Sequence, residues 1–142
     1  KRLKCNGFIF QHLRVNQQSS QLLLFSDNKI SLMNEGHTYE GSLIADQPLE
    51  DAQFSGESKV VAISKDCLYE WDTRTWRMIN RFKLYNGFTK LCVKGEHVAV
   101  GNKLGMVSLN TLGESLKEYA EVGGLVTHVT DLKSNNSGDL MV

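Results

Sequence analysis

Proline, linker-like stretches and an excess of one charge are nearly absent from this 142-residue chain. A single proline, Pro48, and twelve scattered glycines leave no Pro-rich or Gly/Ser-rich linker, so we expect residues 1–142 to belong to one domain. Sixteen basic and sixteen acidic side chains cancel, which excludes a net field that would draw the whole chain to nucleic acid or to an anionic membrane. Any such binding must therefore be local.

Chemically reactive side chains are few and widely spaced. Cys5, Cys67 and Cys92 form no Cys-x-x-Cys pair, which argues against a disulfide framework and a structural zinc site and favours a reducing compartment. The neighbouring Glu50 and Asp51 point to opposite faces of a strand start, which predicts a solvated edge rather than a catalytic carboxylate pair. The four histidines form no metal-binding group, and no catalytic or nucleotide-binding motif occurs. We expect no enzymatic activity, no cofactor, no metal and no small-molecule substrate.

Long apolar runs are also missing, since none exceeds four or five residues. A helix that crosses a bilayer needs roughly 20 apolar residues, so we expect no membrane span and no membrane partner. The chain begins with Lys1 and carries no apolar leader, and we expect it to be an excerpt of a longer protein.

Three segments repeat with a period of 38 residues. The stretches "LLLFSDNKISLMN" (22–34), "VVAISKDCLYEWD" (60–72) and "VAVGNKLGMVSLN" (98–110) align without a gap. Each combines small or apolar residues, a polar turn and an alternating segment, which predicts a two-stranded hairpin. The repeat positions that end the three copies are Asn34, Trp71, Asp72 and Asn110.

The segments between the hairpins supply two further strands in each repeat. One comes from "TYEGSLI", "WRMINRF" and "LKEYAEV", and the other from "LEDAQFSG" and "FTKLCVKG". Four strands in about 38 residues, with no helical period, predict an all-β fold: a partial β-propeller with four-stranded antiparallel blades. We expect about three and a half blades of a single propeller, at residues 8–45, 49–84, 88–122 and, incompletely, 125–142. Since this number cannot close a ring, we expect the remaining blades to come from a longer chain or from another chain.

One basic cluster surrounds the predicted outer strand "WRMINRFK", where alternation places Arg77, Ile79, Arg81 and Lys83 on one face. The cluster consists of Arg74, Arg77, Arg81, Lys83 and Lys90. It suits contact with phosphate or with an acidic partner. It suits better a charged outer strand that prevents edge-to-edge pairing and maintains solubility, and contact with a partner stays open as the alternative.

The repeats resemble the WD-repeat family, although Trp-Asp itself occurs in only one of them. Three stretches go further: "CLYEWDTRTWRMINRFK", "HVAVGNKLGMVSLN" and "LVTHVTDLKSNNSGDLMV". Their order resembles the C-terminal propeller of the eukaryotic U-three-snoRNA-associated protein eighteen family, whose blades read "YVWDxRTxxCxxRF", "ACGSxSGVVNxY" and "TSLxFNxxSEILAI". The matching positions are Tyr69, Trp71, Asp72, Arg74, Thr75, Arg81, Phe82, Val100, Gly101, Gly105, Met106, Val107, Asn136 and Ser137.

This resemblance covers residues 20–142 and implies a nucleolar, and thus nuclear, scaffold of the small-subunit processome, in its UtpB subcomplex. It implies a role in 18S pre-rRNA processing and small-subunit assembly, with other propeller proteins, U three snoRNA and the pre-rRNA as partners. The alternative is a WD-repeat interaction module of another assembly, such as a vesicle coat, chromatin or a ubiquitin-ligase adaptor. Nucleolar localisation would discriminate between the two.

Overall fold

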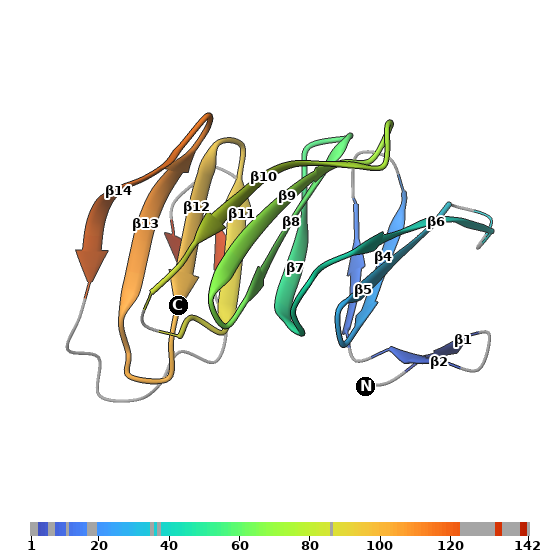
Figure 1. Cartoon of the computed structure of the whole chain (residues 1–142), viewed down its shortest axis with the longest axis horizontal. Helices are drawn as coiled ribbons and strands as arrows, with labels where there is room; N and C mark the ends of the chain where they lie inside the picture. The colour runs from blue at the N-terminus through green and yellow to red at the C-terminus, as the bar shows by residue number, and fades with distance from the viewer. Residues whose placement is uncertain are drawn as a thin grey trace.

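The chain forms three antiparallel four-stranded sheets that follow one another along the sequence and lie side by side in space (Figure 1). This computed structural model describes residues 3–5, 8–10, 12–16, 20–34, 36, 38–85, 87–122, 133–134 and 140–141. Every regular element within those ranges is a strand, which confirms the predicted all-β class. No helix long and apolar enough to cross a membrane occurs in the described ranges.

Each four-stranded sheet is a meander in which consecutive strands pair. The first sheet contains β3 (His12–Val15), β4 (Leu22–Ser26), β5 (Lys29–Met33) and β6 (Tyr39–Ile44). The second contains β7 (Leu49–Ser55), β8 (Lys59–Ser64), β9 (Cys67–Asp72) and β10 (Arg77–Lys83). The third contains β11 (Lys90–Lys94), β12 (His97–Gly101), β13 (Val107–Leu112) and β14 (Leu116–Val122). Two hairpins flank them, β1 (Leu3–Cys5) with β2 (Phe8–Phe10) and β15 (Lys133–Ser134) with β16 (Leu140–Met141).

The sheets can be set against the expected blades. The second sheet spans residues 49–83 and the third 90–122, beside expected bounds of 49–84 and 88–122. The first sheet begins at His12 rather than at residue 8, because Phe8–Phe10 pairs with Leu3–Cys5 instead. Of the expected incomplete blade at 125–142, only β15 and β16 lie within the described residues. The resemblance positions Asn136 and Ser137 lie outside them.

The first strands of neighbouring sheets lie next to one another, with β7 between β3 and β11. Asp51 of β7 is only 1% exposed and connects all three strands. Its Oδ1 accepts a hydrogen bond from Arg14 Nη2 on β3 at 3.0 Å, and its Oδ2 accepts one from the amide of Leu91 on β11 at 2.9 Å. The expectation of a solvated edge is therefore wrong for Asp51, because its carboxylate points into the contact between first strands.

Two apolar layers fill the spaces between the sheets. Strand β8 lies between them and is buried on both faces: Val60 and Ala62 join the layer toward the first sheet, while Val61 and Ile63 join the layer toward the third. This placement explains the run of small apolar residues in "KVVAIS", since alternation of polar and apolar residues is expected only for a strand with one solvated face.

A β-bulge interrupts the pairing of the third and fourth strands in every sheet. In the second sheet, Met78 pairs with Trp71 and Asn80 pairs with Glu70, so Ile79 is the extra residue. The extra residues in the first and third sheets are Glu40 and Tyr119. The bulge reverses the alternation of side chains along the fourth strand.

The third sheet departs from the ungapped alignment by one residue. Val60 pairs with Trp71, but Val98, which lies 38 residues later, pairs with Asn110. The extra residue lies in the longer β12–β13 loop, where Asn102 Oδ1 accepts hydrogen bonds from the amides of Leu104 (3.0 Å) and Met106 (3.1 Å). In the pairing register, Asn110 therefore corresponds to Trp71 and not to Asp72.

Candidate functional site

The predicted basic cluster is divided between two sheets. Arg74 lies in the β9–β10 turn, Arg77, Arg81 and Lys83 lie on β10, and Lys90 begins β11 of the third sheet. The bulge at Ile79 makes Arg77 pair with Asp72, whereas Arg81 pairs with Tyr69 on the opposite face. Arg81 and Lys83 do share a face, but the prediction that Arg77 shares it is wrong, because strict alternation does not continue through a bulge.

Arg81 takes part in a link between the second sheet and the loop that precedes it. Arg81 Nη2 donates to Asp46 Oδ2 at 2.9 Å, the Tyr69 hydroxyl donates to Asp46, and the guanidinium lies 5.8 Å from the centre of the Tyr69 ring. The Tyr69 hydrogen bond, together with Arg81, lowers the pKa of Asp46. Burial, and then the bond to Asp46, raises the pKa of Tyr69 to about 12. This link leaves the exposed Arg74 and Arg77 as the basic residues at the turn end of β10.

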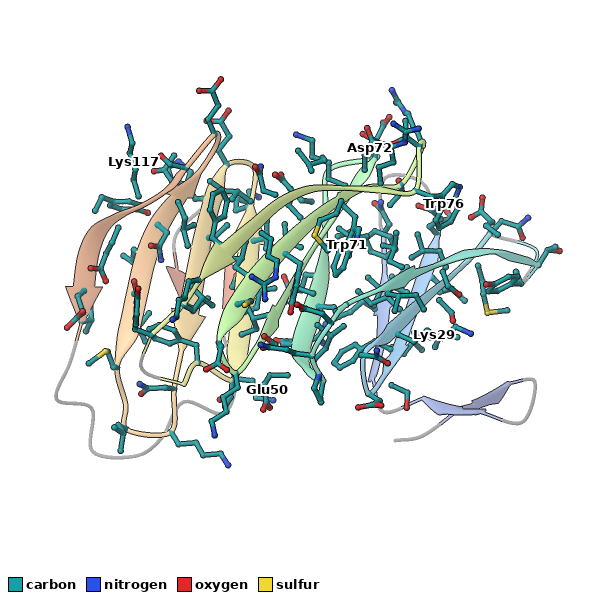
Figure 2. All side chains as sticks on the ribbon, viewed as in Figure 1. Lys29, Glu50, Trp71, Asp72, Trp76 and Lys117 are labelled. Atoms are coloured by element: carbon teal, nitrogen blue, oxygen red, sulfur yellow. The ribbon has the colours of Figure 1, made fainter. Side chains whose placement is uncertain are left out.

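The contact between the first and second sheets is closed by two tryptophans (Figure 2). Trp71 of β9 is 2% exposed and stacks on Tyr69 with ring centres 5.4 Å apart. Trp76 lies in the β9–β10 turn and covers the backbone of Gly41 on β6, so closely that a Cβ at Gly41 would come within 2.7 Å of its ring. Trp71 thus fills the interior of this contact, and Trp76, which is 37% exposed, covers its outer end at β6.

The contact between the second and third sheets contains a cleft of about 310 Å³ instead. Its walls come from strand ends and turns of both sheets. The residues that matter for its chemistry are Lys59, Glu70, Ile79, Asn80, Glu96 and Glu114. Three carboxylates against one ammonium make the cleft acidic.

Glu70 places a carboxylate at the inner wall of this cleft and is only 6% exposed. Its Oε1 accepts a hydrogen bond from Asn80 Nδ2 at 2.7 Å, and Asn80 also donates to the carbonyl of Gly113 at 3.2 Å. Its Oε2 lies 3.8 Å from Lys59 Nζ, an ion pair longer than a hydrogen bond. One oxygen of Glu70 is thus held firmly while the other has a distant cation.

The strand pairing shows which residues of the first contact correspond to the residues that line the cleft. Leu32 pairs with Gly41 across β5 and β6, and Glu70 pairs with Asn80 at the corresponding place in β9 and β10. A fully buried leucine and a glycine covered by Trp76 are therefore replaced by a carboxylate and an amide. Sequence reasoning missed this site, although the ungapped repeat already aligns Glu70 with the apolar Leu32.

Possible metal ligands and cysteines are the remaining reactive groups of the chain. Within the described ranges, no group of three or more His, Cys, Asp or Glu side chains is arranged to hold a metal ion. Cys67 and Cys92 are both buried.

Comparison of the chain with protein-family models gave no match. Comparison with curated proteins gave none either. The resemblance to a family therefore rests on the order of the blade motifs in the sequence.

Proposed function

We propose that the chain is part of a WD-repeat β-propeller that acts as a non-catalytic scaffold of the small-subunit processome in nucleolar 18S pre-rRNA processing. One observation carries the propeller: the first strands of successive sheets are joined by hydrogen bonds between residues one repeat apart. Gln53 of β7 donates to the carbonyl of Leu91 at 2.8 Å, and Asn16 after β3 donates to the carbonyl of Gly56 at 3.0 Å. Their sequence separations are 38 and 40 residues.

A repeated link of this kind favours a radial arrangement. When the first strand of each sheet contacts the first strand of the next, successive sheets fan out from a common axis, as the blades of a propeller do. Each sheet then buries its faces against its neighbours, and only the fourth strands remain at the rim. The bulges in all three fourth strands fit this position, because a bulged edge resists pairing with another chain.

The assignment to the processome rests on the motif order around Trp71 and Asp72. The exposed Arg74 and Arg77 at the turn end of β10 are the residues we expect to contact phosphate groups of U three snoRNA or of the pre-rRNA. Arg74 is also one of the positions that match the resembled family.

The test is a tagged purification of the intact protein from its native cells, with proteins identified by mass spectrometry and RNA by sequencing. We expect U three snoRNA and other propeller proteins of the processome to dominate, together with nucleolar fluorescence of the tagged protein. A vesicle-coat, chromatin or ubiquitin-ligase set without the RNA would overturn the processome assignment and leave the propeller standing.

A matched pair of variants separates direct RNA contact from assembly. Arg77 pairs with Asp72, and Lys117 pairs with Thr111 at the corresponding place in the third sheet. We expect Arg74→Gln with Arg77→Gln to reduce ultraviolet crosslinking to U three snoRNA several-fold, whereas Lys117→Gln leaves it unchanged. Equal crosslinking in both variants would show that these arginines do not touch the RNA.

A further inference from the structure

We propose that the acidic cleft between the second and third sheets binds an arginine side chain of a partner polypeptide. This inference goes beyond the proposed scaffold function, since it needs neither a closed ring nor RNA. It rests on the cleft's shape, on its charge and on the incomplete pairing of Glu70.

The cleft exists because the side chains that close the neighbouring contact are replaced here. At the first contact, the Trp76 ring covers Gly41, and the buried residue beneath is Leu32. At the second contact, the corresponding residues are Asn80 and Glu70, and the β13–β14 turn contributes Gly113 and Glu114 to the cleft wall. A volume of about 310 Å³ thus remains open at the place where an indole ring lies in the adjacent repeat.

The Glu70 carboxylate has only one cation near it, and that cation is distant. Removing an ionised carboxyl group from water costs several kcal/mol unless charge and hydrogen bonds compensate. In Glu70, Asn80 satisfies Oε1, while Oε2 has Lys59 Nζ at 3.8 Å, and the Lys59 side chain is itself 48% exposed. A guanidinium group entering the cleft can donate directly to Oε2.

The rest of the cleft matches an arginine side chain better than a simple cation. Glu96 and Glu114 are exposed at the rim, where they attract positive charge. Ile79, the extra residue of the bulge, contributes an apolar wall against which an alkyl stem packs. A planar guanidinium pairs with more than one carboxylate at once, whereas nucleic acid would be repelled by the three acidic groups.

The test uses the whole chain, labelled with nitrogen-15, and two short peptides as probes. Acetyl-Gly-Gly-Arg-Gly-Gly-amide carries the guanidinium, and the same peptide with citrulline in place of arginine has nearly the same shape without the charge. We expect the arginine peptide to shift the amide resonances of Ile79, Gly95 and Gly113, with an affinity that falls as salt is added. The citrulline peptide should shift them at least about tenfold less at equal concentration.

Three variants locate the binding. Glu70→Gln keeps the size of the side chain and should weaken the arginine peptide about tenfold, and Glu114→Gln at the rim should weaken it a few-fold without touching the core. Glu50→Gln on β7, exposed and outside the cleft, should bind as the unmodified chain does. Equal shifts with the two peptides, or unchanged affinity in both Glu70→Gln and Glu114→Gln, overturn the proposal. Neither result bears on co-purification of U three snoRNA, so the two proposals fail separately.

Discussion

The contact between the first and second sheets and the contact between the second and third have the same backbone plan but different interiors. In both, a four-stranded meander lies beside the next, and a bulge stands at the same place in the fourth strand. The first contact is filled by Trp71 and Trp76, and the second holds an acidic cleft with Glu70 at its wall. Both contacts have an apolar layer, so side-chain size and charge at two or three corresponding positions decide whether the outer end of such a contact is closed or open.

The largest effect is expected from breaking the filled contact at Trp71. Trp71→Ala removes a side chain that is 2% exposed and stacked on Tyr69, and should lower the free energy of unfolding by about 3–5 kcal/mol. Urea unfolding followed by circular dichroism measures this loss, because it does not depend on tryptophan fluorescence.

The control for Trp71→Ala is Met33→Ala. Met33 is the residue of the first sheet that corresponds to Trp71, but it is only half-buried on the face away from the second sheet. We expect Met33→Ala to cost about 1 kcal/mol or less, since the residual cavity is open to water. Similar losses in both variants would show that burial between sheets is not what makes Trp71 important.

Two glycines sharpen the comparison, one at each contact. A Cβ at Gly41 would meet the Trp76 ring at 2.7 Å, whereas a Cβ at Gly113 has no atom within 4 Å. Gly41→Ala should therefore cost about 1–3 kcal/mol because the indole must move, while Gly113→Ala should change stability by about 0.5 kcal/mol or less. Thermal unfolding of both variants gives the difference.

The double variant shows whether Trp76 causes that cost. In a Trp76→Ala background the ring is gone, so Gly41→Ala should become almost neutral. If Gly41→Ala costs the same with and without Trp76, the strain lies in the β6 backbone and the first contact is not held by the ring.

The strand content could be predicted from the sequence because hairpins and repeats are local. Alternation and polar turns mark the pairs at 22–34 and 60–72, and the structure has strands there. The register of the third hairpin could not be predicted, since the ungapped alignment conceals the longer loop around Asn102. A turn that is longer by one residue leaves the pattern of apolar and polar residues in the hairpin looking the same, but it changes which residues pair.

Two further features could not be predicted from the sequence: the β-bulges, and the charged side chains that lie between the sheets. Nothing in "WRMINRFK" marks Ile79 as an extra residue. Alternation alone therefore places Arg77 and Arg81 on the same face of the strand, whereas the bulge places them on opposite faces. Asp51 looked like a surface carboxylate because its partners, Arg14 and Leu91, are 37 and 40 residues away. The site at Glu70 could have been suspected from its alignment with Leu32, although only the structure shows that a cleft accompanies it.

A smaller effect should appear at alkaline pH through Tyr69, which belongs to the filled contact. The folded-state pKa of Tyr69 is raised to about 12, above an unfolded value of about 10, mainly by burial and by its bond to Asp46. Its contribution is therefore fully present below pH of about 10 and is lost as the pH rises toward about 12. We expect this loss to be on the order of 1–2 kcal/mol, since solvent screens the exposed Asp46.

Tyr69→Phe isolates this contribution from the titration of lysines, which both proteins share. The variant lacks the hydroxyl group, so its stability at neutral pH should be lower by about 1 kcal/mol. Its stability should then fall less steeply between pH of about 10 and 12 than that of the unmodified chain. Parallel curves from urea unfolding at each pH would contradict the role assigned to the hydroxyl group.

The smallest effect is expected from converting the open contact toward the filled one. Glu70→Leu gives the cleft wall the same residue type that the first sheet has at the corresponding position, Leu32. It also removes a buried carboxylate whose second oxygen has only a distant cation. The remaining Lys59 side chain is 48% exposed, so no uncompensated buried charge is left behind, and we expect about 1 kcal/mol of added stability in urea unfolding. Binding of the arginine peptide should be lost at the same time. A destabilised Glu70→Leu would mean that the hydrogen bond from Asn80 to Glu70 helps to hold the two sheets together. The carboxylate would then be structural, and the two contacts would differ only in whether aromatic or polar side chains hold them together.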